Sequence, residues 1–307
     1  MDHKKPNLIV LIGPTAVGKT STAIKIAQAI NAPILSADSR QFYKELSIGT
    51  AKPTLKEQAA AKHHFIDNKS IAEEYNASDF EKEAISFLEM HFKTNSNAIL
   101  CGGSGMYIDA VCKGFDSEVP SSDDNIRQEL QNEFEKNGIK SLQKKLKSLD
   151  AVYYGTVDLN NAKRLMRAIE VCLITGKPYS AIRQGKSVVR SFNIVKIGLM
   201  MERAHLYERI NKRVDLMMEA GLLEEVKSVE RYRENNALKT VGYRELFLYL
   251  DGKYTLSEAV EKIKVNSRRY AKRQLSWFKK DGEISWFEPN NWEQILDYLH
   301  QTNLKSR

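Results

Sequence analysis

The chain has 307 residues, of which 42% are hydrophobic and 28% are charged. That length allows about two domains, and the composition supplies a hydrophobic core and excludes a disordered chain or one largely embedded in a membrane. Lys and Arg (47) outnumber Asp and Glu (39), which gives a formal net charge of +8. The surplus favours a polyanionic partner such as a nucleic acid, a phosphorylated substrate or an acidic membrane.

Cysteine use and the N-terminal segment both indicate a reduced, cytoplasmic protein. Cys101, Cys112 and Cys172 are widely spaced and form no Cys-x-x-Cys pair, which argues against a disulfide framework or a zinc ribbon. The first apolar run, Leu8–Ile12, is too short for a signal-peptide core or a membrane span. We therefore expect no contact with a membrane.

The first third of the chain alternates short apolar runs with helical periodicity. Leu8–Ile12, Pro33–Ala37 and Ala98–Cys101 are typical of short buried strands, and the apolar spacing in Thr20–Ile30 predicts a helix. This alternation predicts a parallel sheet with helical crossovers. A later alternating run, Phe192–Leu199, is expected to return to the same sheet.

The middle of the chain is predicted to be helical, with almost no strand signal between about residues 121 and 184. Apolar residues recur at helical spacing in Ile126–Phe134 and Leu142–Leu149, and a third helix, Ala162–Leu173, is closed by Gly176-Lys177-Pro178. The predicted fold class is therefore α/β, with a P-loop-type parallel sheet core, flanking helices and an inserted helical subdomain. The core comprises residues 1–114 and 191–307, and the insertion residues 115–190.

The remaining C-terminal part is also predicted to be helical. Thr255 and Glu258 form the spacing of a capping box, which opens a long helix ending near Gly282. Its second half, Lys262–Lys280, contains no acid, and Trp277 and Phe278 add flat surfaces. The basic residues are Lys262, Lys264, Arg268, Arg269, Lys272, Arg273, Lys279 and Lys280. Two pairs, Arg268 with Lys272 and Arg269 with Arg273, are one turn apart, so we expect a continuous ridge that binds an RNA backbone, with a merely solvated face as the alternative.

Residues 13–20 match the phosphate-binding pattern G-x-x-x-x-G-K-[ST] between a predicted strand and a predicted helix. The matching residues are Gly13, Pro14, Thr15, Ala16, Val17, Gly18, Lys19 and Thr20. The glycines let backbone amides surround a phosphate, and the helix N-terminus adds a positive dipole end. Lys19 adds a charge, and the Thr20 hydroxyl is suited to Mg²⁺. The pattern predicts a di- or triphosphate site without identifying which one.

A nucleotide-hydrolysing enzyme would also need an apolar strand ending in an acid that holds Mg²⁺. The Ala98–Cys101 strand instead runs into Gly102-Gly103. The acid directly after a predicted strand is Asp38, and His63–Asp67 is a weaker candidate. We therefore expect the loop to hold a diphosphate leaving group rather than to drive hydrolysis.

Further motifs follow the phosphate loop along the chain. They are Asp38–Tyr43, Ile48–Pro53, His63–Asp67, Gly102–Tyr107, Arg164–Glu170, Arg203–Ile210, Val241–Arg244 and Ala271–Phe278. This ordered set resembles that of the tRNA dimethylallyltransferases, also called tRNA isopentenyltransferases, over about residues 8–280. Ser104, Arg40 and Phe42 depart from the usual pattern of the family. The lack of a C-terminal zinc finger resembles the bacterial type.

The resemblance implies transfer of a dimethylallyl group from dimethylallyl diphosphate (DMADP) to a tRNA, with release of diphosphate. The implied acceptor is the exocyclic amine of the adenosine at position 37, in the anticodon stem-loop. It also implies Mg²⁺, a monomer, and a channel that tRNA and the diphosphate reach from opposite sides.

This chemistry needs a base and a means of neutralising the leaving group. The loop, Lys19 and Thr20 with Mg²⁺ suit the leaving diphosphate, and Thr15 is suited to bond its bridging oxygen. The resemblance implies Arg203 as a further arginine, with a surface ion pair as the alternative. Asp38 is expected to accept the amine proton; its alternatives are a Mg²⁺ ligand or a helix cap.

The residues expected to contact tRNA are carried mainly by the resemblance. They are Asp38, Ser39, Arg40, Gln41, Ser104, Arg127, Lys163, Arg164, Arg167, Lys239, Gly242, Tyr243, Arg244, Lys272, Arg273, Gln274 and Trp277. Three other functions remain open from the residues alone. They are a P-loop kinase of a small molecule or nucleotide, an isopentenyltransferase acting on free adenine nucleotides, and a nucleotide-gated RNA-binding protein. Whether ATP competes for the loop is also open.

Overall fold

The computed structural model describes residues 5–114, 119–183 and 188–305. The chain forms two compact units. The core unit comprises Met1–Cys112 and Arg190–Arg307, and the inserted unit comprises Lys113–Val189. None of the helices in the described residues is long and apolar enough to cross a bilayer.

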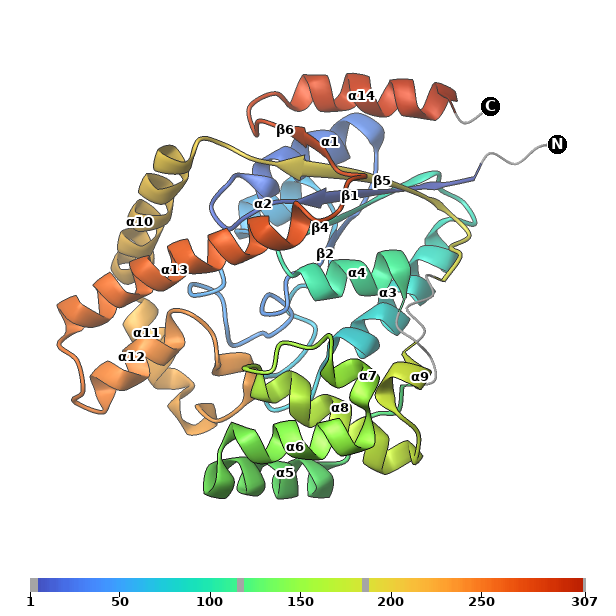
Figure 1. Ribbon diagram of the computed structural model, residues 1–307. Coiled ribbons are helices and arrows are strands. Elements are labelled where there is room, and N and C mark those ends of the chain that lie inside the picture. The colour runs from blue at the N-terminus through green and yellow to red at the C-terminus, as the bar shows by residue number, and fades with distance from the viewer. Residues whose placement is uncertain (1–4, 115–118, 184–187, 306–307) are drawn as a thin grey trace. The chain divides into compact units, whose positions relative to one another are not determined.

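The core unit is built on a parallel sheet that has six strands within the described residues, in the order β3-β2-β4-β1-β5-β6 (Figure 1). The strands are β1 (Asn7–Ile12), β2 (Ile34–Ser36), β3 (His63–His64), β4 (Asn97–Gly102), β5 (Asn193–Leu199) and β6 (Ser285–Phe287). The four predicted strands and their parallel pairing are confirmed. Every residue of β1 is buried because both faces of this central strand are covered.

Helices lie on both faces of the sheet and extend beyond one end of it. They are α1 (Lys19–Ile30), α2 (Leu55–Ala60), α3 (Ala77–His91), α4 (Gly105–Lys113), α10 (Arg203–Glu219), α11 (Leu222–Ser228), α12 (Tyr243–Leu250), α13 (Leu256–Phe278) and α14 (Trp292–Lys305). Two 3₁₀ turns, η1 (Glu230–Tyr232) and η2 (Asn236–Leu238), lie between α11 and α12.

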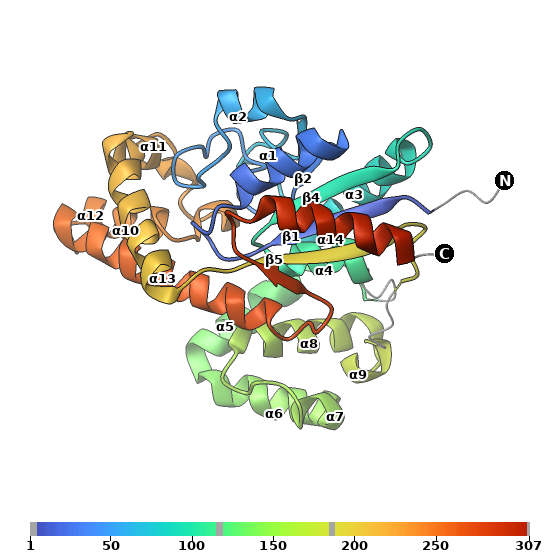
Figure 2. The same cartoon turned by 90° about the horizontal axis from the view of Figure 1, so that it is seen from above.

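The alternation of side chains along β1 separates two hydrophobic cores. Leu8 and Val10 face a cluster supplied by α3 and α4, whereas Ile9 and Leu11 face one supplied by α1, α10 and α14. Figure 1 shows α1 and α14 on one side of the sheet and α3 and α4 on the other, and Figure 2 shows α14 lying along the sheet. This sandwich holds the segment after β1 between rigid layers.

A third cluster joins α10–α13 to the loop that follows β2. Its buried members include Tyr43 and Leu46 from that loop, Ile71 from the segment after β3, and Tyr243 and Leu246 from α12. Helix α13 then runs back toward the sheet, where Phe278 enters the first cluster. The C-terminal helices are therefore fixed to both the sheet and the loop.

The C-terminal prediction is correct at the start of α13 and wrong after its end. Thr255 and Glu258 form the predicted capping box. The helix ends at Phe278 rather than near Gly282, and Ser285–Phe287 forms β6 instead of helix. The helix ends early because the chain must turn between Phe278 and Ser285 to pair with β5.

The inserted unit contains helices joined by short turns and no strand within its described residues, 113–114, 119–183 and 188–189. Its helices are α5 (Asp124–Asn137), α6 (Ile139–Leu149), α7 (Ala151–Tyr154), α8 (Ala162–Thr175) and α9 (Tyr179–Ile182). Leu130, Leu142 and Leu165 lie in its own hydrophobic cluster. Gly176 ends α8 in the left-handed conformation, as the predicted helix stop requires.

Candidate active site

The phosphate loop lies between β1 and α1, at the carboxyl end of the central strand. Gly13 has φ 157°, and a Cβ there would lie 2.8 Å from the carbonyl oxygen of Leu199. Gly18 has φ 113° and precedes α1 without a capping side chain. The first-turn N–H groups of α1 are therefore left to an anion, which is the arrangement that phosphate binding uses.

The Lys19 side chain folds back over the first residues of the phosphate loop. Its Nζ donates hydrogen bonds to the carbonyls of Gly13 (3.0 Å) and Pro14 (2.9 Å). Burial lowers the pKa of Lys19 to about 8, although the neighbouring Cys101 and Asp38 oppose this shift. A bound phosphate would supply the counter-charge that the ammonium group lacks.

Asp38 lies just beyond β2, beside Lys19. Its carboxylate is partly buried and accepts a 3.0 Å hydrogen bond from the backbone N–H of Arg40. Burial raises the pKa of Asp38, whereas the Arg40 N–H and the charge of Lys19 lower it. Burial also raises the pKa of Cys101 to about 11, so its thiol is neutral at pH 7. The structure thus brings Asp38 and the phosphate loop together.

Gln274 connects α13 to the phosphate loop. Its Oε1 accepts a 2.8 Å hydrogen bond from the N–H of Thr15, and its Nε2 donates to the carbonyl of Gly103 at 2.9 Å. The side chain is 6% exposed, and a Cβ on Gly103 would lie 2.3 Å from Nε2. Although Gln274 was predicted among the tRNA contacts, it lies inside the protein at the loop.

Two arginines of α10 lie at the loop, and the sequence prediction missed both. Arg209 Nε donates to the carbonyl of Ala16 at 2.9 Å, and the charge of Arg213 contributes to lowering the pKa of Lys19. The predicted Arg203 lies exposed in the first turn of α10, 5.1 Å from the centre of its Tyr207 neighbour's ring. Arg209 belongs to the Arg203–Ile210 motif, from which it could have been predicted. Arg213 lies one helical turn after Arg209.

The predicted tRNA residues nearest to Asp38 form one hydrogen-bonded edge. The N–H of Ser39 donates to the Ser104 hydroxyl at 3.0 Å, which joins the segments after β2 and β4. Arg40 and Gln41 continue the first of these segments, and all four side chains are partly buried.

The basic ridge is interrupted at two of its predicted residues, while Lys279 and Lys280 at its end are exposed as predicted. Lys264 pairs with Asp215 at 2.8 Å, and Arg268 donates to Asn211, so both turn toward α10. Lys262, Arg269, Lys272 and Arg273 remain exposed along α13, followed by the 42%-exposed Trp277.

The other predicted tRNA contacts differ in exposure. In the inserted unit, Arg127 and Arg167 both pair with Glu170, at 3.0 and 2.6 Å, whereas Lys163 and Arg164 are exposed. In the core unit, two predicted residues are exposed and two are buried. Lys239 and Arg244 are exposed, and Gly242 and Tyr243 are buried.

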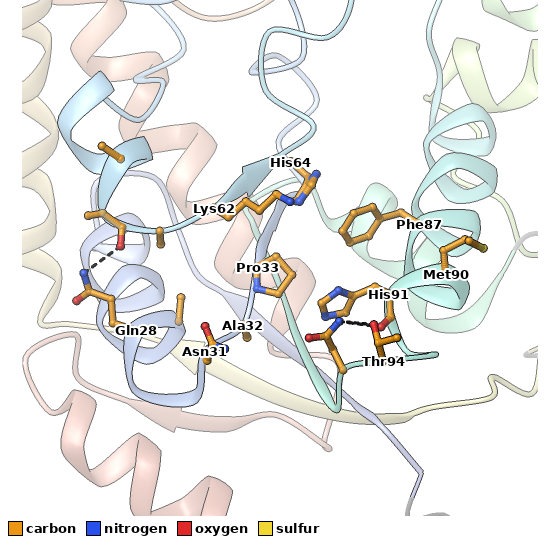
Figure 3. Close-up of a pocket in the computed structure, with 15 residues that line it drawn as sticks. Gln28, Asn31, Ala32, Pro33, Lys62, His64, Phe87, Met90, His91 and Thr94 are labelled. Carbon is orange, nitrogen blue, oxygen red and sulfur yellow. Dashed lines mark hydrogen bonds between the residues drawn. The ribbon is translucent and has the colours of Figure 1, made fainter.

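A cavity of about 710 Å³ lies at the opposite edge of the sheet, at the amino ends of β2 and β3 (Figure 3). Pro33, Lys62, His64, Phe87 and His91 are among its lining residues. Ligands of open α/β sheets bind outside the carboxyl ends of the strands. The phosphate-loop edge, rather than this cavity, is therefore the candidate active site.

The profile of the IPP transferase family matches residues 41–281. The chain belongs to the IPP transferase family. Among curated IPP transferases, it is 52% identical to a tRNA dimethylallyltransferase of Christiangramia forsetii over 95% of this chain and 97% of the relative. It is 48% identical to tRNA dimethylallyltransferase 1 of Bacteroides thetaiotaomicron, with 97% of each chain covered.

Solved IPP transferase structures share the fold. A tRNA isopentenylpyrophosphate transferase of Bacillus halodurans has a TM-score of 0.73 and 36% identity, with 98% of each chain covered. A eukaryotic dimethylallyltransferase, studied acting on tRNA, has a TM-score of 0.79 and 25% identity over 92% of this chain and 74% of that one.

Proposed function

We propose that this chain transfers the dimethylallyl group of DMADP to the exocyclic amine of adenosine 37 in tRNA and releases diphosphate. The observation that supports the proposal is that Asp38 lies beside Lys19 of the phosphate loop, close enough for each charge to shift the pKa of the other. A base next to an anion site suits a reaction in which the base accepts a proton from the nucleophile and the anion site binds the leaving group.

In the proposed reaction, the adenine amine attacks the allylic carbon while the carbon–oxygen bond to diphosphate breaks. Asp38 takes the proton that the amine loses. The loop N–H groups, Lys19, Arg209 and Arg213 hold the departing diphosphate and offset its growing charge. Well-aimed donors are worth about 3–4 kcal/mol each in such transition states. Thr15 and Arg203 are further proposed catalytic residues.

We infer that Mg²⁺ accompanies the diphosphate. Within the described residues, no cluster of three or more His, Cys, Asp or Glu could cage a metal ion. Mg²⁺ bound through substrate phosphates needs only one or two protein ligands, and the Thr20 hydroxyl at the start of α1 fits that requirement. When bound, the ion would neutralise charge on the leaving group.

We propose that the anticodon stem-loop binds through the exposed basic residues of α13, through the segment that carries Ser39, Arg40 and Gln41, and through Lys163 and Arg164. Phosphate contacts of this kind set register, while the acceptor base leaves its stack to reach the site. In this proposal the core unit carries out the chemistry and the inserted unit contacts tRNA. We also propose that the protein acts as a monomer in the cytoplasm, without a membrane partner.

The direct test supplies labelled DMADP with unmodified tRNA or with AMP. We expect label on tRNA and none on AMP. Asp38→Ala should slow transfer about 10²–10⁴-fold while tRNA still binds, whereas Asp297→Ala, which removes an exposed acid of α14, should behave as wild type. Label on AMP would identify a transferase of free nucleotides. Transfer by Asp38→Ala at the wild-type rate would remove Asp38 as the base.

A further inference from the structure

Glu225, in α11, accepts hydrogen bonds from three consecutive backbone N–H groups of the loop after β2. Its Oε2 accepts from Ser47 (2.8 Å) and Ile48 (2.7 Å), and its Oε1 accepts from Gly49 (2.9 Å). Hydrogen bonds to an ionised carboxylate are stronger than neutral ones. A side chain 178 residues away therefore fixes the backbone of this turn.

Tyr243 completes this arrangement from the other side. Its hydroxyl donates to Glu225 Oε1 at 2.6 Å, and its side chain is 0% exposed. The Gly49 backbone lies against the phenol ring, where a Cβ would come within 2.6 Å of Cε2. Burial and the charge of Glu225 raise the pKa of Tyr243, so the hydroxyl keeps its proton and remains a donor. We call Glu225, Tyr243 and the Ser47–Gly49 backbone the clamp.

The clamp is linked to Asp38 through Gln41. The Gln41 Nε2 donates to the carbonyls of Thr50 and Ala51, each at 3.3 Å, directly after the clamped turn. Its Oε1 accepts from the Ser36 hydroxyl at 2.9 Å. The backbone N–H groups of Arg40 and Gln41 in turn lower the pKa of Asp38 by hydrogen bonding to its carboxylate.

We propose that Glu225 is a positioning residue, which acts with Tyr243 through the Gln41 side chain to hold the Asp38 carboxylate toward the acceptor amine. This inference rests on the proposed role of Asp38 as base. It also assigns the buried Tyr243 to this clamp instead of the RNA surface. The phosphate loop belongs to β1 and α1, so loss of the clamp should leave DMADP binding unchanged.

The test compares Glu225→Gln with Glu224→Gln. Both remove one negative charge from α11, but Glu224 is 70% exposed at its side chain and lies outside the clamp. In Glu225→Gln, an amide group replaces one acceptor oxygen and faces N–H or O–H donors. We expect kcat to fall about tenfold or more, as misplacement of a catalytic group commonly causes, with KM for DMADP unchanged. Glu224→Gln should retain the wild-type kcat.

The pH dependence and a double variant separate positioning from general stability. The acid limb of kcat/KM should move to higher pH in Glu225→Gln, because Asp38 loses N–H bonds that lower its pKa. Glu225→Gln combined with Asp38→Ala should be no slower than Asp38→Ala alone, since a residue that acts through Asp38 has no effect without it.

The possible outcomes distinguish failure of the positioning role from failure of the proposed transferase function. A wild-type kcat in Glu225→Gln, or an additive loss in the double variant, overturns the positioning role while leaving Asp38 as base. Full activity of Asp38→Ala instead removes Asp38 as the base, and label on AMP rather than tRNA overturns the proposed function. If Glu225→Gln does not fold, Tyr243→Phe decides, because it keeps the ring against Gly49 and removes one donor. It should lower kcat with KM for DMADP unchanged, and a wild-type kcat would contradict the clamp.

Discussion

The side-chain carbonyl of Gln274 accepts a 2.8 Å hydrogen bond from the backbone N–H of Thr15, 259 residues earlier in the chain. The same amide group donates to Gly103. One side chain of the long C-terminal helix therefore fixes the phosphate loop relative to the end of β4. This links the element that carries the exposed basic residues to the element that holds the diphosphate.

Gln274→Met should weaken DMADP binding. The substitution keeps the length of the side chain but leaves the Thr15 N–H and the Gly103 carbonyl without these partners, which costs about 1–3 kcal/mol for each buried group. We expect KM for DMADP to rise about tenfold or more, because 1.4 kcal/mol corresponds to a factor of ten. Steady-state kinetics measure this, with Gln128→Met at an exposed position of α5 as the control. Equal KM values in the two variants would show that the loop does not depend on α13.

The rate should depend on the protonation of Asp38. Burial raises its pKa above the ordinary value of 3.8, and a base must be deprotonated to act. We therefore expect kcat/KM to rise with pH through this raised pKa and then to level off. A pH profile with saturating Mg²⁺ measures this, and Asp38→Glu should move the acid limb. A limb at or below pH 3.8 would show that Asp38 is not the controlling group.

Binding of diphosphate should take up protons at Lys19. Burial lowers the pKa of Lys19 to about 8 in the ligand-free protein, and bound diphosphate, which carries several negative charges, favours the charged ammonium, so binding raises that pKa. Affinity is then greatest below pH 8 and falls as pH rises through it. At pH 8, titration calorimetry with inorganic diphosphate in two buffers should report uptake of roughly half a proton.

Two lysine variants locate this uptake. Lys19→Met should abolish it, whereas Lys25→Met, at an exposed position of the same helix, should leave it unchanged. Proton uptake that persists in Lys19→Met would assign it to another group.

The exposed basic face of α13 should contribute to tRNA affinity through phosphate contacts. Lys272→Ala should weaken binding of all tRNAs alike and reduce the slope of log K against log salt by about one. Filter binding at several salt concentrations measures this, with the exposed Lys82→Ala of α3 as the control. A slope unchanged from wild type would place Lys272 outside the tRNA contact.

Most of the sheet could be predicted because its strands leave local patterns. The unbroken apolar run at Leu8–Ile12 is confirmed as a strand buried on both faces. Ser285–Phe287 could not be found in this way, since three residues carry too little periodicity and their pairing with β5 is a tertiary contact. The His63–His64 strand is shorter still.

The site could be predicted only where its residues are contiguous in sequence. Gly13–Thr20 is one segment with one function, so its geometry follows from its pattern. Gln274 and Arg209 reach that segment from distant helices, and helical spacing does not reveal which way a side chain turns. For the same reason the spacing of Lys264 and Arg268 suggested a ridge, while acceptors on α10 draw both away from it.

The central claim is that the Asp38 carboxylate faces the acceptor amine across the phosphate loop. A crystal structure with a non-reactive DMADP analogue and an unmodified anticodon stem-loop measures this directly. We predict the diphosphate in the Gly13–Thr20 loop and an Asp38 oxygen about 2.6–3.2 Å from the exocyclic nitrogen of adenine. A carboxylate turned away from that nitrogen, with another side chain in its place, would contradict the mechanism.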